Sequence, residues 1–280
     1  MAASGNGTGL SQGGVTLHNA SLMANARGVP RAAGDWSPRR NFRAPARVLA
    51  LAMVCCLAIP LQARSSDFSG EVALTSQLVD RGLALTPPTP AVQGALSLAL
   101  PEGWSLGVSG GVEIRSPGHV PESLAQLSRA VTLSNDWQMQ ASLLYYHYAD
   151  NAQARIYDRT EAGVGWTYRD ILSFNLSADY TLGAKESQVR PAADLNLHWP
   201  LPWHLSLSAG AGVAQYVIAP YHRSSGYDYT GTYYYGHAGL LWSKGPWRLE
   251  LDRVFTDPTI RQHWGNLAAS PWLGTISWSF

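Results

Sequence analysis

The sequence predicts an all-β fold in which twelve antiparallel strands close into a transmembrane β-barrel, preceded by an N-terminal signal peptide. Three observations lead to this prediction. Segments of about ten residues alternate between apolar and polar side chains, short turns alternate with longer loops, and tryptophans recur beside the short turns. Alternation gives a strand one face for lipid and one for water, and only a closed barrel can hide such strands in a membrane.

Residues 1–63 are expected to be a leader that ends in a secretory signal peptide. Four arginines precede an apolar run of fourteen residues, 48–61, and the small residue Ala63 follows. A helix needs about 20 apolar residues to span a bilayer, so the run is short for an anchor and suits a cleaved signal. An uncleaved anchor helix is the alternative, and the true start could lie downstream of Met1. The barrel domain is then 64–280.

The predicted mature chain excludes several classes of site. Cys55 and Cys56 lie within the apolar run and leave with the signal, so no thiol remains for a disulfide, a thiolate metal site or a cysteine nucleophile. Removing the leader's six arginines and its Asp35 leaves 14 basic and 18 acidic residues, a net charge of −4. This charge argues against nucleic acid as a partner. No cofactor or metal is expected.

The last ten residues, 271–280, show the alternation most clearly. Their even-numbered positions carry Trp272, Gly274, Ile276, Trp278 and Phe280, and the positions between them are mostly small and polar. An aromatic face opposite a small polar face suits a strand between lipid and water. The terminal Phe280 resembles the insertion signal of bacterial outer-membrane barrels, which implies barrel-assembly machinery as a partner. A half-buried strand of a soluble protein is the alternative.

The other strands follow from the same alternation and from the turns between them. The first, at 72–81, is the least regular, and the seventh, at 172–182, is the clearest. Arg169-Asp170 is read as a two-residue hairpin turn. The remaining predicted strands cover 91–100, 104–115, 124–133, 137–148, 157–168, a segment ending at residue 199, 203–217, 232–242 and 247–255.

Eight tryptophans lie at the strand ends next to short turns or at the chain end, so they fall at one rim of the predicted barrel. Indole rings favour the membrane interface, where the ring is apolar and the N–H reaches water. With the terminal phenylalanine they form the predicted membrane girdle: Trp104, Trp137, Trp166, Trp199, Trp203, Trp242, Trp247, Trp278 and Phe280.

A short motif at the start of the barrel resembles a known family. Thr75-Ser76 is followed by Arg81-Gly82 and then by Pro90-Ala-Val-Gln-Gly94, after which a glycine-rich strand begins. This order is similar to that of the TorF family of outer-membrane porins. The resemblance implies a signal peptide, a barrel of similar length and passive transport.

Charged side chains at predicted inward positions are the candidate lumen and selectivity residues, because rings of charge in a water-filled lumen set ion preference. The alternative is a network that satisfies buried charges inside a plugged barrel. Inward glycines would leave room for water or would serve strand curvature. The candidates are Arg81, expected near the rim, and Glu113, Arg115, Arg159, Glu161, Asp179, Asp194, Arg248, Glu250 and Asp252.

Two arginines, Arg129 and Arg253, fall on the predicted outward face. Each could extend its guanidinium to a lipid headgroup. Each could instead mark a β-bulge that reverses the alternation, which is the preferred interpretation for Arg253 near a strand end.

An enzyme is the less favoured function. An outer-membrane lipase or deacylase needs serine, histidine and an orienting polar group close together. His147 has Ser142 and Asp150 nearby in sequence, but Ser142 has the opposite parity. There is no G-x-S-x-G nucleophile elbow, because the segments with that spacing lie in the leader or at 103–111, along the predicted strand 104–115. A non-conducting structural or adhesive barrel, with the tyrosine-rich segment 219–230 as its contact surface, is the other alternative.

The sequence therefore predicts a non-enzymatic porin of the outer membrane of a Gram-negative bacterium. Small hydrophilic solutes or ions would diffuse passively through its lumen, and membrane lipid would surround it.

Overall fold

The computed structural model describes residues 68–280 apart from 118–119, 149–153, 156–157, 183–187, 221–228 and 264–266, and it leaves out the side chains of 154–155, 216–220, 229–230 and 263. The predicted leader, its cleavage site and Asp150 lie outside the described residues. Within them, no helix has the length and apolar character needed to cross a membrane.

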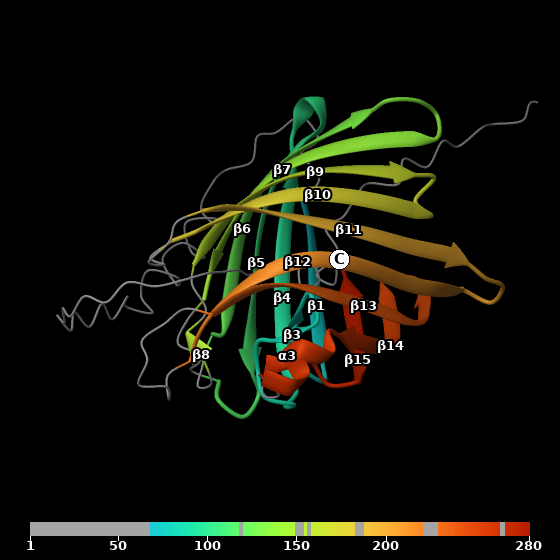
Figure 1. Ribbon diagram of the computed structural model, residues 1–280. Helices are drawn as coiled ribbons and strands as arrows, with labels where there is room; N and C mark the ends of the chain where they lie inside the picture. The colour runs from blue at the N-terminus through green and yellow to red at the C-terminus, as the bar shows by residue number, and fades with distance from the viewer. Residues whose placement is uncertain are drawn as a thin grey trace, which may run out of the picture.

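Twelve strands close into a single antiparallel barrel (Figure 1), which confirms the predicted fold class. Each strand pairs with the next one along the barrel, and β15 pairs with β1 to complete the circle. The strands are β1 (Phe68–Thr75), β4 (Ala91–Ala99), β5 (Trp104–Glu113), β6 (Glu122–Thr132), β7 (Trp137–His147), β9 (Arg159–Tyr168), β10 (Leu172–Thr181), β11 (Val189–Pro200), β12 (Leu205–Pro220), β13 (Tyr229–Lys244), β14 (Trp247–Thr256) and β15 (Trp272–Ser279).

Short connections gather at one end of the barrel, which we name the turn end. Arg169 and Asp170 form a two-residue turn there, with φ angles of 50° and 57°. The Arg169 guanidinium also donates to the Asp136 carboxylate of the neighbouring turn at 2.7 Å. That hydrogen bond lowers the pKa of Asp136. The predicted hairpin is therefore confirmed, and it links two adjacent turns.

The opposite end, which we name the loop end, carries four further elements. These are the paired strands β2 (Val79–Asp80) and β3 (Leu83–Ala84), the helix α3 (Pro258–His263), and the short strand β8 (Ala154–Arg155). β8 pairs with the far end of β12. β2, β3 and α3 come from the connections β1–β4 and β14–β15, which flank the pairing of β1 with β15.

The prediction for the first strand was wrong at its end. β1 stops at Thr75 and does not continue to Arg81. The five residues from Gln77 to Arg81 are all buried, whereas a strand in the wall would alternate between buried and exposed. The chain therefore leaves the wall after Thr75 and turns into the barrel.

Two smaller predictions were also wrong. Trp203 does not begin a strand: Trp203 and His204 each have φ 63° and form a turn, and β12 starts at Leu205. Arg253 marks no bulge, because its pairing with Ala238 and Trp272 continues without interruption. Arg129 and Arg253 stay on the outer face, and each guanidinium lies over a cross-strand tryptophan ring, at 5.3 Å and 5.4 Å from the ring centroid.

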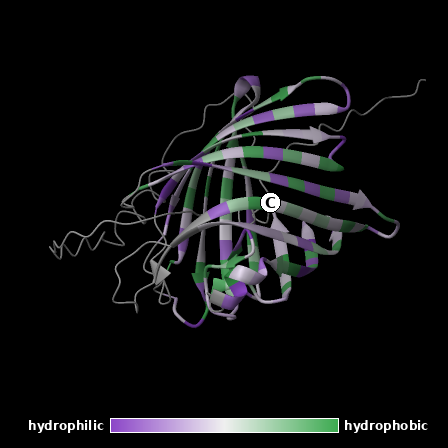
Figure 2. Cartoon of the chain, viewed as in Figure 1, coloured by the Kyte–Doolittle hydropathy of each residue, from purple (hydrophilic) through white to green (hydrophobic). Residues whose placement is uncertain are grey.

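The outer surface of the barrel is apolar. Hydrophobic and hydrophilic residues alternate along the strands (Figure 2), and the exposed members include Leu106 and Val108 on β5 and Leu249 and Leu251 on β14. A soluble protein would bury these side chains in a core, whereas here they face outward from a closed cylinder. The wall therefore separates an apolar exterior from a polar interior.

The pairing of β1 with β15 ends at Phe280. Its backbone N–H and C=O each bond Gly70 at 2.9 Å, and its ring stacks with Trp278, with centroids 5.0 Å apart. The Phe280 ring occupies the position that a Cβ on residue 70 would take. Gly70 therefore admits the ring that covers the end of this strand pair.

We predict that Gly70→Val weakens the closure of the barrel. Its side chain would push Phe280 outward, at a cost of about 1–3 kcal/mol. The measurement is the temperature at which the detergent-solubilised barrel loses its compact mobility on an unheated gel. Gly94→Val is the matched control, because Gly94 is an outward glycine on β4 with no atom within 4 Å of a Cβ. Equal melting of the two variants would contradict the role of Gly70.

Candidate functional site: a charged constriction inside the barrel

The segment between β1 and β4 folds into the lumen as a hairpin, residues 77–86, which we name the inward hairpin. Val79 pairs with Ala84 and Asp80 with Leu83. The two turn residues, Arg81 and Gly82, have φ angles of 44° and 77°, as in a two-residue turn of type I′. Glycine adopts this region freely, but it costs arginine roughly 1–2 kcal/mol. The contacts of Arg81 must therefore offset a local cost.

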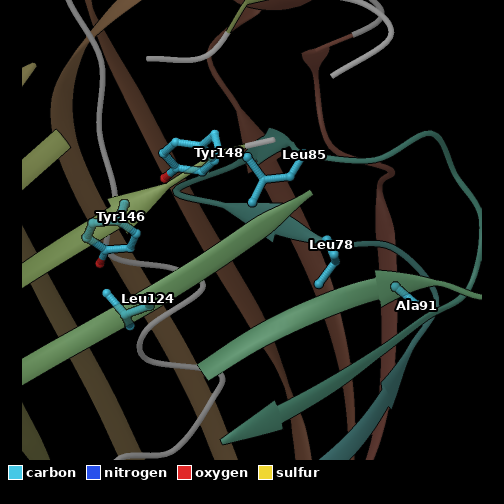
Figure 3. Packing of buried hydrophobic residues seen from close by; sticks show 6 residues of the cluster. All are labelled: Leu78, Leu85, Ala91, Leu124, Tyr146 and Tyr148. Carbon is cyan, nitrogen blue, oxygen red and sulfur yellow. The ribbon is translucent and has the colours of Figure 1, made fainter. Parts of the chain in front are cut away.

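Apolar contacts anchor the inward hairpin to the wall. Leu78 and Leu85 pack against side chains of the wall and of the loop end (Figure 3), namely Ala91, Leu124, Tyr146 and Tyr148. Leu83 packs on the opposite side against Ala192, Ala214, Tyr233, Tyr235 and Ile260. Because these partners come from both halves of the barrel, the hairpin bridges the lumen.

Glycines of the wall make room for these side chains. A Cβ on Gly111 would lie 2.8 Å from Cδ1 of Leu78, and one on Gly212 would collide with the ring of Tyr235. At these two positions the absent side chain serves packing of the lumen, and not space for water as one sequence interpretation held.

Arg81 at the tip of the hairpin is fully buried. Its Nη2 donates to Glu161 at 3.0 Å, to Ser177 at 3.2 Å and to Asp194 at 3.3 Å. Its Nη1 lies 3.9 Å from Asp179. Three adjacent strands, β9, β10 and β11, supply the carboxylates. One cation therefore holds the hairpin to a quarter of the wall.

A second buried arginine, Arg159 on β9, lies beside the first. Its guanidinium donates to Asp80 of the hairpin at 3.4 Å and lies 3.9 Å from Glu161. It also covers the ring of Tyr146, with 3.8 Å from Cζ to the ring centroid, a cation–π contact. Glu161 is thus shared by Arg81 and Arg159, and charges of both signs alternate through the network.

The connection between β14 and β15 holds the hairpin from the other side. Thr256 donates to the carbonyl of Gly82 at 2.7 Å, and the N–H of Ala269 donates to the same carbonyl at 3.2 Å. Ile260 of α3 is fully buried in the cluster that contains Leu83. Figure 1 shows α3 beside β3 at the loop end. Two connections together narrow this end of the lumen.

The structure brings five predicted site residues together around the hairpin: Arg81, Arg159, Glu161, Asp179 and Asp194. Arg81 was expected near the rim and instead lies inside the lumen. On β14 the buried Glu250 and Asp252 and the half-buried Arg248 share the inward parity. Glu113 is half-buried at the end of β5. Arg115 lies in a turn beyond β5 and is exposed, so its placement on the inner wall was wrong.

Several residues of this site were not predicted. Asp80 and the buried tyrosines Tyr146, Tyr233 and Tyr235 line it, and the Tyr235 hydroxyl donates to Asp194. A signal for the hairpin was present, since an aspartate, an arginine and a glycine follow one another between two apolar pairs, Leu78-Val79 and Leu83-Ala84. Such a pattern favours a tight turn over a continuous strand.

Toward the turn end the inner wall is polar and less filled. Although Ser128, Ser206, Ser208 and Ser277 are buried there, many of its other side chains are half-buried, in contrast to the fully buried groups around Arg81. They include Ser105, Ser109, Gln126, Ser173, Asn175 and Asn196. The described lumen therefore runs from a polar vestibule at the turn end to a charged constriction near the loop end.

No protein-family profile and no curated protein matches the sequence. Among solved structures, the chain is similar to the NanC porin, with 12% identity and a TM-score of 0.46 over 76% of this chain and 99% of that one. It is similar to the KdgM porin, with 8% identity and a TM-score of 0.45 over 76% and 99% of the two chains. OccK11 of Pseudomonas aeruginosa gives 11% identity and a TM-score of 0.34 over 78% and 67%.

The geometry of the chain itself places it in a membrane. A closed barrel leaves no unpaired strand edge, and the exterior is apolar while the interior is polar and charged. These are the conditions for crossing a bilayer with strands. The chain therefore has the architecture of a transmembrane β-barrel, as predicted.

We predict that Arg81→Met loosens the inward hairpin. The variant removes the cation that faces Glu161, Asp179 and Asp194, and breaking such buried pairs costs about 3–5 kcal/mol. Hydrogen exchange at the amides of Leu85 and Ala269 should accelerate by at least about 100-fold, because both amides bond within or against the hairpin.

The control for this experiment is Arg169→Met, which removes an exposed ion pair at the turn end. It should leave both amides unchanged. Unchanged exchange in Arg81→Met would show that apolar packing alone holds the hairpin.

Proposed function

We propose that the barrel is a porin-like channel for passive diffusion of small hydrophilic solutes or ions. The observation that carries the proposal is the polar inner wall, which leads from the turn end to a single charged constriction. A barrel that served only as a scaffold would not need small polar side chains such as Ser105, Ser173 and Asn196 along its lumen. Transport of this kind needs no catalytic group and no cofactor.

The constriction would set both size and charge preference. We place the constriction where the inward hairpin meets β9, β10 and β11, because the ion pairs of Arg81 join the hairpin to the wall there. The inward charges of the described lumen include more acids than bases. The acids are Glu71, Asp80, Glu113, Glu122, Glu161, Asp179, Asp194, Glu250 and Asp252, and the bases are Arg81, Arg159, Arg190 and Arg248. An acidic excess on a pore wall favours cations.

Three further proposals rest on the sequence interpretation. The eight tryptophans at the turn end form the membrane girdle, and six of them are exposed on the outer face or in a turn there. Phe280, at the end of the β1–β15 pair, serves as the recognition signal for the barrel-assembly machinery. The order of Thr75-Ser76, Arg81-Gly82 and Pro90-Ala-Val-Gln-Gly94 is the basis for relating the chain to the TorF family, and Arg81-Gly82 form the tip of the inward hairpin.

We predict that removing the inward hairpin enlarges the pore. In planar bilayers the wild-type barrel should give small discrete conductance steps. Replacing residues 78–85 with two glycines should raise the single-channel conductance several-fold, because the segment that narrows the loop end is gone. Gly94→Val, on the lipid side of β4, should leave the conductance unchanged.

Silent bilayers from folded wild-type barrels and from the hairpin deletion would contradict the channel and support the non-conducting alternative. The tyrosine-rich segment 219–230 that the alternative needs lies mostly outside the described residues.

We predict that the paired change Glu250→Gln and Asp252→Asn reduces cation preference. Both carboxylates face the lumen from β14 and are buried there, so neutralising them removes two negative charges from the wall. The reversal potential in a tenfold salt gradient should move toward zero. A reversal potential equal to that of the wild type would show that these residues lie outside the ion path.

A further inference from the structure

Three polar residues lie close together on the lipid-facing surface near the loop end. Ser123 is the second residue of β6, and His147 is the last residue of β7. The two are Cα partners in the β6–β7 pairing. Their strand neighbours Leu124 and Tyr146 are buried inside the barrel, so Ser123 and His147 share the outer face. Asp158 stands just before β9 and reaches His147 from the other side.

The aspartate holds the imidazole in one orientation. His147 Nδ1 lies 2.8 Å from Asp158 Oδ2, and the Tyr145 hydroxyl donates to the same oxygen at 3.2 Å. The other oxygen, Oδ1, accepts the N–H of Tyr148 at 3.0 Å. With Nδ1 directed at the carboxylate, Nε2 is the nitrogen that can take a proton from a nucleophile.

Ser123 is placed to be that nucleophile. Side chains of directly paired residues on one face have Cβ atoms about 4.5–5.5 Å apart, which allows the hydroxyl and the imidazole to meet by rotation of their side chains. On the other side of Ser123 its Cα partner is Gly110 of β5. A Cβ on Gly110 would lie only 3.8 Å from that of Ser123. The absence of a side chain there leaves space beside the hydroxyl.

The surroundings suit an acyl chain. Toward the middle of the membrane the same face presents Val108, Leu127, Leu143 and Tyr145, all exposed. His147 lies ten residue steps along β7 from Trp137 at the turn end, which is about 25 Å along the membrane normal at a strand tilt of about 40°. That is one thickness of the apolar band, so His147 lies at the boundary of headgroups and acyl chains in the leaflet at the loop end.

We propose that Ser123, His147 and Asp158 form a hydrolytic site for carboxyl esters of long-chain lipids in that leaflet. Ser123 Oγ attacks the ester carbonyl carbon while His147 Nε2 takes its proton. The carbon–oxygen bond of the ester breaks, and His147 returns the proton to the departing alcohol. Water then attacks the acyl-serine, His147 takes the proton of that water and gives it to Ser123 Oγ, and the fatty acid is released. Asp158 stabilises the imidazolium and holds its orientation.

This site differs from the one that the sequence offered. Ser142 faces the lumen, as its parity predicted, and is half-buried there. The register of β6 and β7 instead places Ser123 of β6 beside His147.

The test uses the full barrel purified from membranes in detergent. Fatty acid released from a phospholipid with a labelled acyl chain is measured in mixed micelles, beside a water-soluble short-chain ester. Wild type should release the fatty acid, and Ser123→Ala and His147→Ala should each lower the rate by about 1000-fold or more. Asp158→Asn should lower it by at least about 100-fold. Ser142→Ala is the matched control and should keep the wild-type rate.

A long-chain fluorophosphonate gives a second readout that does not depend on turnover. It should attach to Ser123 in the wild type and in Ser142→Ala, and labelling should be lost in His147→Ala while the gel mobility of the folded barrel is retained. Absence of both hydrolysis and labelling in the folded wild type would overturn the proposal, as would hydrolysis that persists in Ser123→Ala. Hydrolysis of only the short-chain ester would overturn the assignment of a lipid substrate.

Discussion

The ion pairs of Arg81 are the interaction on which the inside of this barrel depends. A guanidinium with no exposed surface is tolerable only where carboxylates surround it, since an isolated buried charge costs far more than packing can return. Glu161, Asp179 and Asp194 supply that surrounding from three adjacent strands. The same three carboxylates would repel one another without the arginine. The inward hairpin therefore needs the carboxylates of the wall to balance the charge of Arg81, and the wall needs Arg81 to balance the charge of its carboxylates.

The rest of the lumen follows from this requirement. The hairpin must cross the barrel to bring Arg81 to β10, so its flanks need apolar contacts on both sides, which Leu78 and Leu83 provide. The wall must also leave space, which it does at Gly111 and Gly212. The connection between β14 and β15, which carries Ile260 and Ala269, holds the hairpin near the β1–β15 pair. The ion pairs, the apolar contacts and the glycines of the wall therefore all act to hold the inward hairpin in place.

The sequence was sufficient for the wall and insufficient for what lies inside it. Strand parity follows from alternation alone, so the inward placement of Glu161, Asp179 and Asp194 could be predicted from their neighbours. A local turn signal was present in residues 77–86, but the direction of this hairpin into the lumen could not be predicted, because it is held by residues eighty or more positions away, such as Glu161 and Asp194. The preferred interpretation of Arg253 as a bulge was wrong for a related reason: its cation–π partner Trp272 lies on another strand, and the sequence does not show that the two are neighbours.

The sequence also does not show which residues of neighbouring strands lie side by side on the outer face. Parity assigns each residue to lumen or lipid, but it does not say which residues of neighbouring strands stand opposite one another. That depends on register, which the turn between two strands sets. In the β6–β7 hairpin the register places Ser123 opposite His147, although 24 positions separate them in the chain, whereas Ser142, only five positions from His147, lies on the other side of the wall. A barrel can therefore carry solute chemistry inside and lipid chemistry outside, with the register of one hairpin deciding whether the outer residues act together.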